Sequence, residues 1–146
     1  MKPAIFWGGL FCGVLDITAA FVVYGLRGAK PIRILQSIAS GLLGADSFKG
    51  GFATAALGLV LHFVIAFGAA TVYFVVSRKL DFLVQQAVVS GVLYGIAVYL
   101  FMTYIVLPLS AVRKTPFSLS GLITGLIIHM ICVGPPIALA VRRYSK

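Results

Sequence analysis

Charged side chains are scarce in this sequence, and acidic ones are almost missing. Charged residues make up 10% of the 146 positions, and only three of them are acidic. A soluble domain carries about 25% charged residues. So few charges cannot cover a water-facing surface, which excludes an ordinary soluble domain and indicates lipid as the solvent.

Groups that carry enzymatic chemistry are also lacking. The three acidic residues lie far apart in the sequence and cannot supply the paired carboxylates of acid–base hydrolysis. No serine lies in a nucleophile-elbow motif, and no Gly-rich phosphate-binding loop follows a strand. We therefore predict that the protein is not an enzyme.

Cysteine is used only twice, at Cys12 and Cys132. Both residues lie inside apolar runs, where cysteine packs as a small apolar side chain, so we expect no disulfide. Neither residue belongs to a C-x-x-C-H motif, which excludes the covalent attachment of a c-type haem.

Basic residues, in contrast, give the chain a formal net charge of +9. The Lys and Arg residues are mostly confined to short breaks between apolar runs, a pattern that suits the anionic headgroups of a lipid bilayer. A nucleic-acid-binding protein would need a basic face on a soluble domain, and we predict no such partner. Because the basic residues divide equally between the two sides of the predicted topology, the positive-inside rule assigns no orientation.

Hydrophobic residues are abundant, at 61% of positions with a mean hydropathy of +1.10. Four apolar stretches, at residues 4–26, 51–77, 84–107 and 118–141, exceed the roughly 20 residues that a helix needs to cross about 30 Å of hydrocarbon. We predict an all-α fold, an integral membrane four-helix bundle that forms a single transmembrane domain over residues 1–146.

The long break after the first span carries its own pattern. Pro31 is typical of the first position of a helix, and apolar residues then recur at helical spacing with polar residues between them. We predict an interfacial amphipathic segment over residues 31–44. The alternative is a folded loop that packs over the ends of the long helices.

The chain contains two histidines, and the same pattern precedes both. Gly58-Leu-x-x-His62 in the second span matches Gly125-Leu-x-x-His129 in the fourth. This faint repeat is compatible with a bundle built from two repeated αα-hairpins. After His129 come Pro135 and Pro136, which free the carbonyls of residues 131 and 132 and predict a kink.

Asp16, His62 and His129 are the candidate site residues, because each lies within about 3 Å of the middle of its span. Small residues line one stripe of each helix and indicate that these three side chains face the interior of the bundle. An ionisable residue at this depth suggests function by default. The alternative is structural: each imidazole bonds to a hydroxyl or carbonyl of the next helix, and Asp16 is a hydrogen-bonding hub.

Three functions remain open. In the first, the protein is a non-enzymatic accessory or cofactor-holding membrane subunit, with a b-type haem between His62 and His129 and room for it beside Gly58 and Gly125. In the second, it is a small homo-oligomeric transporter or channel with Asp16 as its proton site and the histidines beside it. In the third, it is a subunit of a larger membrane complex and carries no chemistry.

The last two thirds of the chain resemble a known group of membrane proteins. Leu61-His62-Phe63, Ala66-Phe67 and Tyr73, followed by Gly91 and Gly95, Leu107-Pro108-Leu109, Pro116, the stretch from Gly125 to His129 and Arg142-Arg143, carry the resemblance. This pattern is similar to that of the YagU-like family of bacterial inner-membrane proteins. The resemblance implies four helices and a multi-pass location in the bacterial inner membrane, and it implies no reaction.

Overall fold

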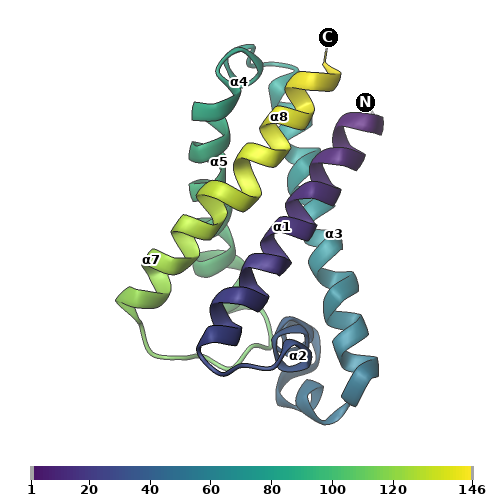
Figure 1. Cartoon of the computed structure of the whole chain (residues 1–146), viewed down its shortest axis with the longest axis vertical. Coiled ribbons are helices and arrows are strands. Elements are labelled where there is room, and N and C mark those ends of the chain that lie inside the picture. The colour runs from purple at the N-terminus through teal and green to yellow at the C-terminus, as the bar shows by residue number, and fades with distance from the viewer. Residues whose placement is uncertain (1, 146) are drawn as a thin grey trace.

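Four long helical segments lie side by side in the computed structural model, which describes residues 2–145 (Figure 1). Two are unbroken: α1 (Lys2–Leu26) and α3 (Gly51–Ser77). The third consists of α5 (Ala87–Phe101), the π-helical turn η2 (Met102–Val106) and α6 (Leu107–Leu109), and the fourth of α7 (Leu119–Ile128), the π-helical turn η3 (His129–Val133) and α8 (Gly134–Tyr144). Each segment is long and apolar enough to cross a membrane. The predicted all-α bundle of a multi-pass membrane protein is confirmed.

The third span begins at Ala87, three residues after the predicted start at residue 84. The short helix α4 (Phe82–Gln85) ends at Gln85, and Gln86 leaves the helical region with φ −107° and ψ 51°. In an unbroken helix the carbonyl of Leu83 would accept from a main-chain amide. Here it accepts instead from the hydroxyls of Tyr73 at 2.9 Å and Ser90 at 3.0 Å. These hydroxyls satisfy a polar group that would be costly to leave unpaired in lipid.

Both π-helical turns lie directly before prolines. In η3 the amide of Gly134 donates to the carbonyl of His129, five residues earlier, and Pro135 and Pro136 follow. In η2 the amide of Leu107 donates to the carbonyl of Met102, and Pro108 follows. Proline cannot donate, so the α-helical ladder fails at these points, and a wider turn gives the available amides other acceptors. A π turn therefore precedes Pro135 and Pro136, where a kink was predicted.

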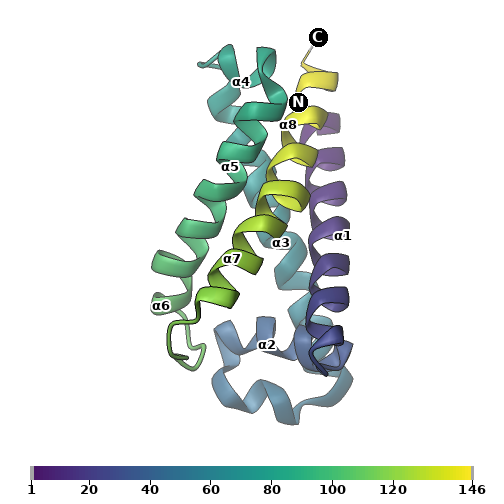
Figure 2. The same cartoon turned by 60° about the vertical axis from the view of Figure 1, so that its left-hand side comes forward.

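The segment after α1 is a helix, as predicted. α2 (Pro31–Leu43) continues into the 3₁₀ helix η1 (Gly44–Lys49) and crosses the end of the bundle, between α1 and α3 in Figure 1 and broadside in Figure 2. Its buried residues are Ile34, Gln36, Ala39 and Ser40. A Cβ atom at Gly58 of α3 would overlap the carbonyl oxygen of Leu35, so the two helices touch backbone to backbone at this glycine.

A small polar network holds α2 against α3. The hydroxyl of Ser47, which is fully buried, donates to the carbonyl of Gln36 at 2.8 Å. The Gln36 amide donates to the carbonyl of Gly51 at 3.1 Å, and the Thr54 hydroxyl donates to the carbonyl of Ser47 at 2.6 Å. These bonds join α2, η1 and the first turn of α3.

Ser47→Ala is expected to destabilise this junction by about 1–3 kcal/mol, because it removes a donor from a buried carbonyl and leaves a gap. Hydrogen exchange of residues 31–49 and thermal unfolding in detergent measure the effect. Ser37→Ala is the matched control, since the Ser37 hydroxyl donates only within its own helix, to Ile34 at 2.6 Å. Equal losses in the two variants would contradict a role for the inter-helix network.

Apart from Ile17, Ile34, Ala39, Ala55 and Ala140, the buried apolar residues form one cluster, which lies in one part of the bundle. Its residues are Ala4, Cys12, Ala66, Ala70, Tyr73, Phe74, Ala87, Val133, Ile137, Ala138 and Val141. They belong to the part near the two termini and α4, which lie at the same end of the molecule (Figure 1). Towards the α2 end, α7 and α1 diverge in this view. The three candidate residues lie where this core ends.

Candidate functional site

The three ionisable residues are each one helical turn beyond the core. Asp16 follows Cys12 on α1, His62 precedes Ala66 on α3, and His129 precedes Val133. A spacing of four residues corresponds to about 6 Å along a helix. The three residues therefore lie at a common level, at the edge of the packed part of the bundle, and all three are partly buried.

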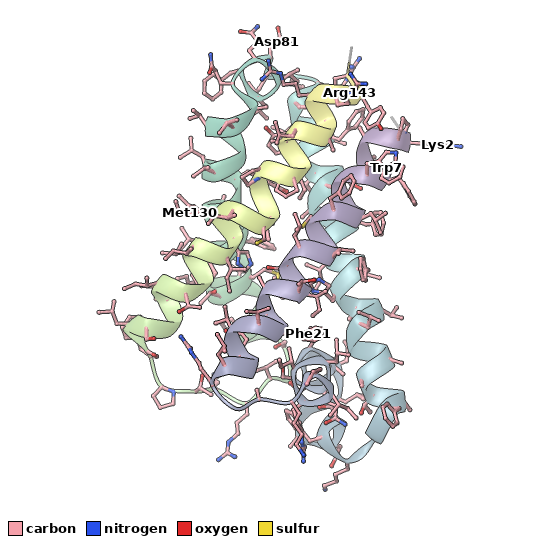
Figure 3. All side chains as sticks on the ribbon, in the orientation of Figure 1. Lys2, Trp7, Phe21, Asp81, Met130 and Arg143 are labelled. Atoms are coloured by element: carbon pink, nitrogen blue, oxygen red, sulfur yellow. The ribbon has the colours of Figure 1, made fainter. Side chains whose placement is uncertain are left out.

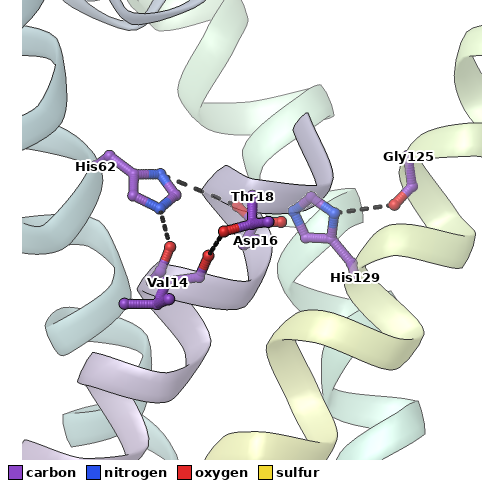
Figure 4. Close-up of polar contacts among 7 residues, drawn as sticks. Val14, Asp16, Thr18, His62, Gly125 and His129 are labelled. Atoms are coloured by element: carbon purple, nitrogen blue, oxygen red, sulfur yellow. Dashed lines mark hydrogen bonds and ion pairs between the residues drawn. The ribbon is translucent and has the colours of Figure 1, made fainter. Parts of the chain in front are cut away.

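Asp16 and His62 form a pair between α1 and α3 (Figure 4). The Nδ1 atom of His62 lies 3.9 Å from Oδ2 of Asp16, which is an ion-pair distance and longer than a direct hydrogen bond. The Nε2 atom of His62 lies 2.8 Å from the main-chain carbonyl of Gly13. The side chain of His62 is 12% exposed and that of Asp16 is 21% exposed.

These contacts determine which ring nitrogen of His62 carries the hydrogen that binds Gly13 and which one faces Asp16. A carbonyl oxygen only accepts, so Nε2 must carry the hydrogen in the bond to Gly13. Nδ1 is then the atom that faces Asp16. The pair can hold one proton, either on Nδ1 next to a carboxylate or on the carboxyl group next to a neutral imidazole.

His129 approaches α1 from the other side. In Figure 4 Asp16 lies between the two imidazoles. The Nδ1 atom of His129 donates to the carbonyl of Gly125 in its own helix at 2.9 Å, and the ring packs edge-on against Tyr99 of α5, with centroids 5.2 Å apart. Within residues 2–145 no ion pair joins His129 to Asp16, so the pair has a single histidine.

The two glycines predicted to make room for a haem have other neighbours. A Cβ at Gly58 would overlap the main chain of Leu35, and a Cβ at Gly125 would overlap the ring of Tyr99. Packed protein atoms already occupy both positions. An axial ligand must also offer a free ring nitrogen to the iron, whereas both nitrogens of His62 face protein acceptors. The residues in this arrangement do not fit a haem between His62 and His129.

Two contacts in this site were not predicted. The first is the carbonyl of Gly13, whose bond to His62 matches the structural alternative for that imidazole. The second is the ring of Tyr99, which packs on His129. Gly13 could have been suspected, because a glycine one turn before Asp16 leaves its helix backbone open to a neighbour. A Cβ there would overlap Phe63, the residue next to His62.

Cys12 and Cys132 have free thiols, and no three His, Cys, Asp or Glu side chains of residues 2–145 gather closely enough to hold a metal ion. Comparison with family models, curated proteins and solved structures gives no match to this chain. The resemblance to the YagU-like family stays a prediction, and the site's own geometry is the basis for a function.

Proposed function

We propose that this protein is a proton-linked membrane transporter or channel in which Asp16 and His62 together form the protonation site. The observation that carries the proposal is the 3.9 Å approach of a carboxyl group and an imidazole on neighbouring helices. Intramembrane Asp and His residues are typical relay groups. The bond to Gly13 is enough to hold a histidine that has only a structural role. It does not explain why a carboxyl group lies opposite Nδ1.

The position of the pair supports a path for protons. Towards the termini, packed apolar side chains close the interior. Towards the α2 end, the Arg27 guanidinium donates to Thr124 of α7 at 3.1 Å, so polar groups lie on that side. Protons reach Asp16 from the α2 side, and the core is the barrier that a transport cycle has to open. We place this cycle in the bacterial inner membrane, on the strength of the family resemblance.

The proposal is tested with the purified full-length protein in liposomes that contain a pH-sensitive dye. A potassium gradient with valinomycin sets an inside-negative potential, and internal acidification is followed. We expect faster acidification than in protein-free liposomes under the same potential. Proton entry at the protein-free rate would contradict the proposed function.

A further inference from the structure

A groove of about 470 Å³ runs between α1 and the fourth span, and no residue of α3 lines it. One wall consists of Trp7, Phe11 and Leu15 of α1. The other consists of residues of η3 and α8, including Pro135, Pro136 and Leu139. Trp7 and Phe11 stack with ring centroids 5.5 Å apart and make a continuous aromatic wall.

The groove has one charged group, and it lies at one end. Arg143 and Tyr144 close the groove near the termini. Figure 3 shows Arg143 at the same end of the molecule as Trp7, with Lys2 directed away from the bundle. The groove is therefore apolar along its length and basic at the end that meets the membrane surface. Trp and Tyr are enriched at that depth.

The length of the groove matches one leaflet of a bilayer. From Trp7 to Leu15 a helix rises about 12 Å, and from Ile131 to Arg143 about 18 Å. Half of the hydrocarbon thickness is about 15 Å. An acyl chain that starts at the level of Arg143 would thus end near Leu15 and Ile131, at the level of the midplane.

We propose that this groove binds one anionic phospholipid, with an acyl chain along the aromatic wall and the phosphate on Arg143. A guanidinium binds phosphate oxygens in a bidentate manner, which a zwitterionic headgroup matches less well because its own cation competes. A second copy of this chain is a poorer occupant. If it docked in parallel about a two-fold axis through the groove, it would bring two Arg143 side chains together.

Native mass spectrometry of the detergent-solubilised full-length protein, titrated with phosphatidylglycerol or phosphatidylcholine of the same acyl chains, tests the proposal. We expect phosphatidylglycerol to bind more tightly, and Arg143→Gln to weaken its binding about fivefold or more. Arg142→Gln is the matched control, because Arg142 has the same charge and is exposed but does not line the groove. Equal effects of the two substitutions would overturn the proposal.

Leu139→Trp provides a second test that leaves the charge intact. Leu139 is 47% exposed and lines the groove, so an indole at this position fills the space for the acyl chain. We expect reduced binding of phosphatidylglycerol with Arg143 still present. Unchanged lipid binding would overturn the proposal. Unchanged lipid binding together with the loss of a dimer would show that a second copy covers the groove instead.

Discussion

Replacing Asp16 by asparagine is expected to lower the proton flux into liposomes by about 100-fold, the smaller end of what a positioned proton-transfer group contributes. Asparagine has nearly the same shape and can still take part in hydrogen bonds, but its side-chain amide does not accept or release a proton at physiological pH. The initial rate of internal acidification, at equal amounts of reconstituted protein, measures the effect.

Asp46→Asn is the matched control for this change. Asp46 pairs with Lys49 at 3.1 Å, and both side chains are more than 80% exposed, at 82% and 81%. Exposed pairs of this kind contribute about 0–1 kcal/mol to stability. The Asp46→Asn variant should therefore fold and conduct as the wild type does. An equal fall in both variants would mean that the loss of any carboxylate, and not of Asp16 in particular, slows the flux.

His62→Gln separates the structural bond from the proton site. The amide of glutamine can replace Nε2 as the donor to Gly13, but it does not titrate. We expect a fall similar to that of Asp16→Asn, and no further fall when the two changes are combined, because residues that act as a unit are not additive. A wild-type rate in His62→Gln would refute the shared proton.

The spans could be predicted from the sequence because lipid imposes a simple constraint. A helix must present about 20 apolar residues, and every main-chain polar group must be satisfied within the segment or by a close neighbour. The second span, Gly51–Ser77, begins and ends where hydropathy placed it. α2 was also predictable, because Pro31 marks its start and its apolar residues recur at helical spacing.

The irregular turns depend on contacts that no local pattern contains. At the break at Gln86, the hydroxyls of Tyr73 and Ser90 donate to the carbonyl of Leu83, and Tyr73 belongs to another helix, α3. Pro135 and Pro136 predict a kink, and they do not predict the π turn that precedes them. The π turn before them directs the carbonyl of His129 against Gly95 of α5, where a Cβ would overlap it.

The sequence predicts how deep in the membrane the three candidate residues lie. It does not predict which of them contact one another. Depth follows from counting residues along each span, and each of the three residues lies four positions from a residue of the buried apolar cluster. Which of them meet depends on how each helix is rotated and on which helix lies between the others. A haem is predicted between His62 and His129, whereas His62 meets Asp16 on α1. In Figure 4, His129 lies on the other side of Asp16. Gly58 illustrates the same point, because its open face receives α2.

The largest loss of stability is expected from Gly134→Ala, at about 3 kcal/mol. A Cβ at Gly134 would overlap the carbonyl oxygen of Gly91 and lie 2.7 Å from the amide nitrogen of Gly95. Both are main-chain atoms of α5, so no change of rotamer can relieve the overlap, and α5 and α8 must move apart. Unfolding of the detergent-solubilised protein, followed as a function of denaturing detergent or temperature, measures the loss.

Two further glycines turn this prediction into a graded series. Gly91→Ala would place its Cβ 2.9 Å from Cα of Pro135 and 3.0 Å from Cβ of Ala138, a milder overlap that still requires the main chains of α5 and α8 to shift, by less than for Gly134→Ala. Gly68→Ala meets nothing within 4 Å on α3 and should stabilise the helix by up to about 1 kcal/mol, because alanine is the better helix former. The expected order of stability is Gly68→Ala, then Gly91→Ala, then Gly134→Ala. If Gly134→Ala proved as stable as Gly68→Ala, the close contact of α5 with α8 would be refuted, and with it the packing of the core next to the site.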